Sequence, residues 1–184
     1  MNYAKGFLGI RWAVSDDDGD ALIYAVEIRG VKDSEWLPLK DKIKEKYFSW
    51  DTTEFPDGEY VVRITASDAP DNPPDQALST TLESDPFLID NTPPRILDLT
   101  ATPSGNRIAV HWRAHDASST IDRAEYSVNG ADWLMAAPVT RLSDSRNEEY
   151  RLALERATPG DQVIAVRVTD EYDNQAVEKI VVKR

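Results

Sequence analysis

The chain alternates apolar and polar residues over many short segments. Ile10, Trp12 and Val14 share one side of such a segment, and residues 108–114 repeat the alternation. A period of two is typical of β-strands that bury one face. The same pattern predicts further strands at 22–29, 46–52, 59–67, 79–89, 95–102, 121–129, 148–155, 162–169 and 176–183.

Residues that favour tight turns separate these segments. Examples are Pro56-Asp57-Gly58, Asn129-Gly130 and Pro159-Gly160-Asp161. No segment keeps the period of about 3.6 residues that marks a helix. The best helical candidate, residues 39–47, is short and mostly charged, so we interpret it as a solvated connection. The pattern therefore predicts an all-β protein.

Three landmarks occur twice along the chain, which indicates an internal repeat. They are Trp-x3-Asp at 12–16 and 112–116, Asp-x2-Asp-Asn at 68–72 and 170–174, and a tryptophan at positions 36 and 133. The segment Asp90-Asn91-Thr92-Pro93-Pro94 separates the two copies, and its prolines cannot donate to a sheet. We therefore expect two domains, residues 1–91 and 92–184, each a β-sandwich of short strands.

Each copy resembles a fibronectin type III domain. The resemblance lies in a Trp in the second strand (Trp12, Trp112), a Tyr in the third (Tyr24, Tyr126) and a Pro/Gly turn before the sixth. The whole chain resembles the tandem fibronectin III-like repeats found in the C-terminal region of large secreted bacterial proteins. This resemblance implies two tandem fibronectin III/immunoglobulin-like β-sandwiches.

Two departures from this family pattern lead to further expectations. Gln162 stands where the first copy has Tyr60, so a tyrosine corner is expected only in the first domain. No alternating segment precedes Phe7 as 95–102 precedes the second copy. The first domain is therefore expected to lack its first strand.

The charge balance excludes several partners. The chain holds 21 basic and 33 acidic residues, a net charge of −12, which argues against nucleic acid and anionic lipid. Residues 1–91 carry most of this acidity, and we expect the charge to keep the chain monomeric. The longest uncharged stretches have eight residues, well short of the roughly 20 that a membrane helix needs.

Other sequence features bear on chemistry and location. The chain has no Cys, which excludes disulfides, thiolate nucleophiles and cysteine-based zinc sites. Residues 1–11 do not form a secretory signal, so the chain is either cytoplasmic or a piece of a longer exported protein. The family resemblance favours the second option, with an extracellular, cell-surface or periplasmic location.

The acidic run at residues 16–20 is the candidate metal site. Ca²⁺ prefers carboxylate and carbonyl oxygens, so Asp16, Asp18 and Asp20 are possible calcium ligands. Glu27 stands where the last ligand of an EF-hand would be, but a predicted strand runs into it. The alternative, which we favour, is an Asp-rich turn without metal, and no other cofactor is expected.

Two further polar groups favour structural roles. In the Asp-x2-Asp-Asn loops, Asp and Asn side chains cap turns by bonding their own backbone. His111 and His115 lie four residues apart on one strand, about 13 Å at ~3.3 Å per residue, too far to share an ion. We interpret the loops as turns and the histidines as solvated.

No motif in the chain supports catalysis. There is no Gly-x-Ser-x-Gly elbow and no phosphate-binding loop, so we do not expect an enzyme. The preferred hypothesis is a spacer or a protein-protein interaction and adhesion unit, whose partners are neighbouring domains or another protein. The alternative is a carbohydrate- or small-ligand-binding accessory module of an enzyme. Trp36 and Trp133 are the ligand candidates, since exposed indole faces stack on sugar rings.

Overall fold

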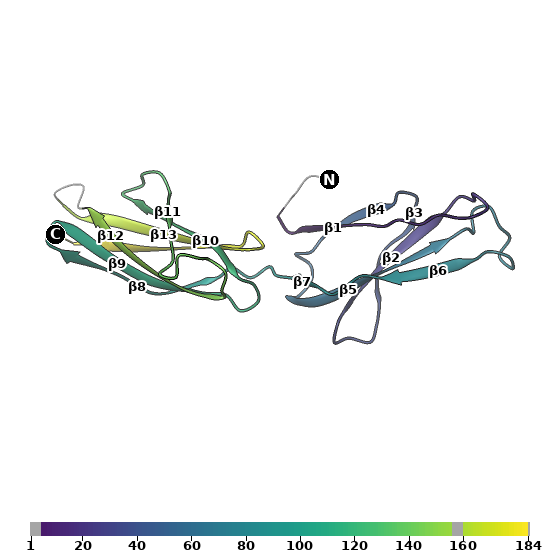
Figure 1. Ribbon diagram of the computed structural model, residues 1–184, viewed down its shortest axis with the longest axis horizontal. Helices are drawn as coiled ribbons and strands as arrows, with labels where there is room; N and C mark the ends of the chain where they lie inside the picture. The colour runs from purple at the N-terminus through teal and green to yellow at the C-terminus, as the bar shows by residue number, and fades with distance from the viewer. Residues whose placement is uncertain (1–4, 156–159, 184) are drawn as a thin grey trace. The chain divides into compact units, whose positions relative to one another are not determined.

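A computed structural model describes residues 5–155 and 160–183, and this part of the chain contains strands but no helix. It accordingly has no helix long and apolar enough to cross a membrane. The chain divides into two compact units, Met1–Ile89 and Asp90–Arg184 (Figure 1). Asp90 therefore lies in the second unit and not, as the sequence led us to expect, in the first. Asp90 is buried in the second unit, where its carbonyl accepts a hydrogen bond from the Asn174 side chain at 2.9 Å.

The described residues of the first unit form seven strands in two antiparallel sheets. β1 pairs with β4, while the larger sheet has the order β3-β2-β5-β6, with β7 also on β5. The strands are β1 (Phe7–Arg11), β2 (Ile23–Gly30), β3 (Leu37–Ile43), β4 (Tyr47–Asp51), β5 (Gly58–Ser67), β6 (Ser79–Glu83) and β7 (Phe87–Ile89). Within the described residues β1 pairs only with β4, and residues 1–4 lie outside them.

Aromatic residues form much of the core of the first unit. Trp12 is 8% exposed, which confirms its predicted burial, and its ring meets that of Tyr24 edge to face at 5.2 Å. Trp50 is also buried and stacks on Phe48. The hydroxyl of Tyr60 donates a hydrogen bond to the carbonyl of Pro56 at 2.8 Å. The tyrosine corner expected in this unit is thus confirmed.

The second unit also has two antiparallel sheets, of orders β12-β9-β8 and β11-β10-β13-β14. Trp112 is 0% exposed, as predicted, and stacks on the buried Tyr150 with centroids 4.8 Å apart. The strands are β8 (Arg95–Ser104), β9 (Arg107–His115), β10 (Ile121–Val128), β11 (Leu134–Ala136), β12 (Asn147–Glu155), β13 (Gln162–Asp170) and β14 (Gln175–Val182). The all-β sandwich architecture is therefore as the sequence predicted.

Four parts of the strand prediction were wrong. The first alternating segment was expected to continue through Trp12 and Val14, but β1 ends at Arg11. The charged segment 39–47, taken for a solvated connection, overlaps β3, an edge strand whose exposed charges suit an unpaired sheet edge. Only Leu39 and Ile43 of this strand pack against the core. The expected strand 79–89 is interrupted near Pro86. Its two parts, β6 and β7, pair with different parts of β5. The short β11 was not predicted.

Candidate metal centre

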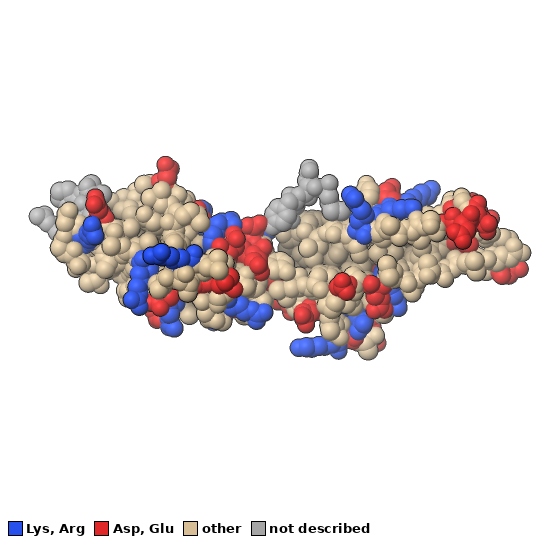
Figure 2. All heavy atoms as spheres, in the orientation of Figure 1, with Lys and Arg blue, Asp and Glu red and all other residues tan. Residues whose placement is uncertain are grey.

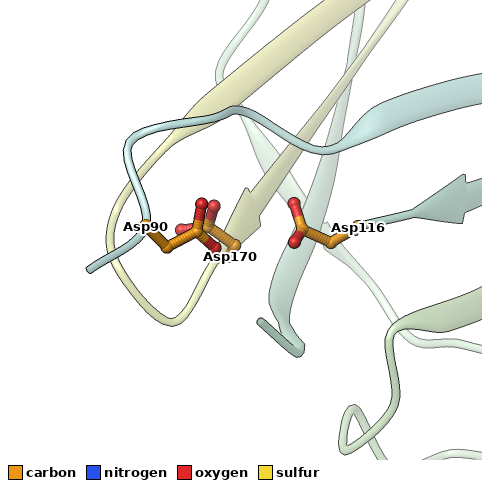
Figure 3. Close-up of side chains that lie close together, drawn as sticks. All are labelled: Asp90, Asp116 and Asp170. Atoms are coloured by element: carbon orange, nitrogen blue, oxygen red, sulfur yellow. The ribbon is translucent and has the colours of Figure 1, made fainter. Parts of the chain in front are cut away.

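Three aspartates from three separate segments meet at one end of the second unit. Asp116 follows β9 directly, Asp170 ends β13, and Asp90 lies before β8. One carboxylate oxygen from each lies within 4.8 Å of the others. In Figure 3 the carboxylates of Asp90 and Asp170 overlap, and the carboxylate of Asp116 is directed toward them. The antiparallel pairing explains the meeting, since β8 begins beside the end of β9.

Backbone amides orient each of the three carboxylates. In every case one oxygen, Oδ1, accepts hydrogen bonds from N–H groups two to four residues further along, as in Asx turns. The donors are Thr92 for Asp90, Ser118 and Ser119 for Asp116, and Tyr172 and Asn174 for Asp170, at 2.8 to 3.1 Å. The loops thereby fix the direction of the second oxygen as well.

Asn174 links two members of the group. Its side-chain amide donates to the carbonyl of Asp90 at 2.9 Å and to Oδ2 of Asp170 at 3.0 Å. Asn174 is itself buried. The segment before β8 is therefore held against the loop between β13 and β14 by hydrogen bonds that do not depend on a metal.

Burial makes the close approach of these carboxylates costly. Asp90, Asp116 and Asp170 are 4%, 2% and 1% exposed. Two ionised carboxylates 4.8 Å apart repel by about 3 kcal/mol at an effective dielectric constant of about 20. No Lys or Arg in the described part of the chain forms an ion pair with Asp116 or Asp170. The donated hydrogen bonds offset part of this repulsion, and a proton or a bound cation would offset more of it.

The protonation of Asp170 reflects this environment. Burial raises the pKa of its carboxyl above the ordinary value, and the charge of Asp90 acts in the same direction. Hydrogen bonds from Asn174 and Tyr172 lower the pKa and offset part of the rise. Asp170 is thus easier to protonate than an exposed aspartate when no cation is bound.

All three aspartates were noted separately in the sequence, but their convergence was not predicted. The turn role predicted for Asp170 and Asn174 is confirmed by their hydrogen bonds. Asp116 was noted only as a landmark of the repeat, and Asp90 only as part of the connection between the copies. A usable signal was present, because Trp-x3-Asp and Asp-x2-Asp-Asn both place an aspartate at a strand end.

The acidic run of the first unit forms a turn. Oδ1 of Asp16 accepts hydrogen bonds from the amides of Asp18 and Asp20, at 3.0 and 3.1 Å. Oδ2 of Asp20 accepts one from the side chain of Asn72 at 2.8 Å. Among the described residues, these aspartates do not form a group of three converging ligand atoms. Asp16 and Asp68, the first-unit counterparts of Asp116 and Asp170, instead line a pocket of about 300 Å³.

The two candidate ligand-binding tryptophans occupy matching places in the two units. Both are half-buried, and an arginine lies over each ring. Cζ of Arg63 is 4.4 Å from the ring centroid of Trp36, and Cζ of Arg167 is 4.3 Å from that of Trp133. Arg63 is held by Glu27 and Arg167 by Glu125, each at 2.8 Å on the neighbouring strand. Cζ of Arg29 also lies 4.8 Å from the ring centroid of Trp36, so arginine side chains already contact both indoles.

The two histidines have separate polar partners. Nε2 of His111 lies 3.1 Å from a carboxylate oxygen of Glu149, and Nδ1 of His115 lies 2.8 Å from the side-chain oxygen of Asn147. Both histidines are partly exposed. Neither belongs to the converging carboxylate group found in the described residues.

Comparison with known proteins relates the chain to fibronectin III-like structures. No family model and no curated protein sequence matches it. The CbhA fibronectin(III)-like modules of Clostridium thermocellum are similar over 98% of this chain and 86% of theirs, with 19% identity and a TM-score of 0.46. The FN1–FN3 domains of chicken CNTN1 are similar over 98% of this chain and 62% of that chain, with 17% identity and a TM-score of 0.45.

Proposed function

We propose that the chain is a non-catalytic tandem β-sandwich module that acts as a spacer within a larger exported protein. The observation that carries this proposal is the strand layout of the second unit. Asp90 lies at one end of β13, beside Asp170, while Val182 pairs with Gln162 at the other end. The nine residues of β13 span roughly 26 Å. A unit with its first and last segments so separated extends a chain by its own length.

The first and last strands of this unit also suit a load-bearing role. β8 and β14 contact one another and both run away from the aspartate group. Tension on the two ends would pull these strands in opposite directions along their length. The contacts that β8 and β14 make with each other and with their neighbouring strands must then break together, and not one after another.

The partners in this proposal are neighbouring domains of the parent protein or another protein. The placement outside the cytoplasm rests on the resemblance of the repeat to modules of secreted bacterial proteins. Figure 2 shows acidic side chains gathered in patches on both units, with basic side chains between them. The net charge of −12 opposes self-association and supports a monomer.

Force spectroscopy tests the spacer role directly. The chain has no native Cys, so a pair of introduced cysteines defines the pulling points. Pro93→Cys with Lys183→Cys loads the second unit end to end, whereas Asn106→Cys with Lys183→Cys pulls from one end only. We expect a clearly higher unfolding force for the first pair, because unfolding under force is governed by the unfolding barrier. Equal or lower force for the first pair would contradict the spacer proposal.

A further inference from the structure

We propose that the second unit binds a calcium ion between Asp90, Asp116 and Asp170. The three side chains come from segments far apart in the sequence, yet one oxygen of each lies within 4.8 Å of the others. The carboxylate of Asp116 faces those of Asp90 and Asp170 (Figure 3). This site differs from the acidic run at residues 16–20 and does not depend on the spacer role.

The second oxygen of Asp116 gives independent support. Asp116 is 2% exposed, and its Oδ1 is engaged by the amides of Ser118 and Ser119. Its Oδ2 is buried and has no hydrogen-bond partner among the described residues. Buried polar atoms almost always have a partner. The carboxylate that carries this oxygen faces those of Asp90 and Asp170 in Figure 3, so the unpaired oxygen points to a ligand.

The donor set selects the kind of cation. All three ligands are hard carboxylate oxygens, and the group contains neither His nor Cys, the ligands that zinc and copper favour. Ca²⁺ accepts six to eight oxygens in flexible geometry, with carboxylates binding through one or two oxygens and water completing the shell. Mg²⁺ demands near-ideal octahedral geometry and keeps most of its water. Three buried carboxylates, one at the end of a strand and two in the connections between strands, therefore favour Ca²⁺.

A bound ion would act on stability. It would neutralise the mutual repulsion of the three carboxylates and tie the segment before β8 to the ends of β9 and β13. Because the unfolded chain does not assemble this site, the ion would favour the folded state by mass action. The melting temperature of the second unit should then rise with calcium concentration.

The test combines calorimetric titration with thermal melting of the full chain, first stripped with EDTA, at pH 7.5. Wild type should bind one Ca²⁺ per chain below 10 mM, more tightly than Mg²⁺, and the melting temperature should rise across the titration. Asp116→Asn keeps the Oδ1 acceptor for the two amides but removes the charge, and it should weaken binding at least tenfold. Asp16→Asn, the matched change in the first unit, should leave binding unaltered.

Each alternative result would overturn the proposal. If wild type shows no heat of binding and no rise in melting temperature at 10 mM Ca²⁺, a proton shared among the carboxylates, and not an ion, offsets their repulsion. Equal or tighter binding of Mg²⁺ would refute the choice of calcium. Loss of binding in Asp16→Asn and not in Asp116→Asn would move the site to the first unit. If Asp116→Asn fails to fold by near-ultraviolet circular dichroism, Asp90→Asn serves as the second variant, and the wild-type titration still decides.

Discussion

The guanidinium of Arg167 lies over the ring of Trp133, with Cζ 4.3 Å from the ring centroid. Arg63 takes the equivalent position over Trp36 in the first unit, at 4.4 Å. Each arginine also pairs with a glutamate on the strand next to its own, so the same three-residue stack is built twice. In this arrangement the tryptophans pack over part of the outer face of a sheet.

The stack predicts a modest structural effect for Trp133→Ala. A partly exposed cation-π contact contributes about 0.5–1 kcal/mol, and loss of the packed ring adds a similar amount. We expect the free energy of unfolding of the second unit to fall by about 1–2 kcal/mol in urea titrations. Retention of the protein on polysaccharide affinity gels should not change. Retention by wild type that Trp133→Ala abolishes would instead identify Trp133 as a sugar-binding residue.

Trp112→Ala should be far more damaging than Trp133→Ala. Trp112 is fully buried and stacks on Tyr150, so truncation leaves a large cavity between the sheets. Such changes cost about 3–5 kcal/mol, a large part of the stability of a small domain. Chemical denaturation should show the second unit strongly destabilised or unfolded. A loss no greater than that of Trp133→Ala would contradict the role of Trp112 in the core.

The sequence predicted the cores better than the edges and the aspartate group. Alternation reveals a strand when one face is buried, and it correctly placed Trp12 and Trp112 inside. β3 lacks that contrast, because an edge strand carries charges on residues that an inner strand would bury. The aspartate group depends on which strand ends share one end of a sandwich. That relation comes from topology, and Asp90 has no pattern of its own to reveal it.

Tyr60→Phe tests the tyrosine corner of the first unit. The substitution keeps the ring against Phe55 but removes the hydrogen bond from the hydroxyl to the carbonyl of Pro56. A hydrogen bond of this kind contributes about 0.5–1.5 kcal/mol, so the first unit should lose about that amount. Tyr47→Phe is the control, since Tyr47 is exposed. Equal stability of the two variants in urea would show that the corner is not stabilising.

The last prediction concerns the alkaline stability of the second unit. Burial raises the pKa of Tyr150 to about 12, and the charge of the neighbouring Glu148 adds to the rise. In the unfolded chain a tyrosine titrates near pH 10. Between these values the unfolded state releases the proton while the folded state keeps it, so the stability contributed by the neutral hydroxyl is complete below pH 10 and falls as pH rises toward 12.

Tyr150→Phe isolates this contribution. The free energy of unfolding of the second unit should fall more steeply with pH in wild type than in the variant, by about 1.4 kcal/mol per pH unit between roughly pH 10 and 12. Lysines and the other tyrosines titrate in both proteins and cancel in the difference. Urea titrations at intervals from pH 8 to 12 measure it. A difference that stays constant with pH would mean that Tyr150 ionises in the folded unit as readily as in the unfolded chain.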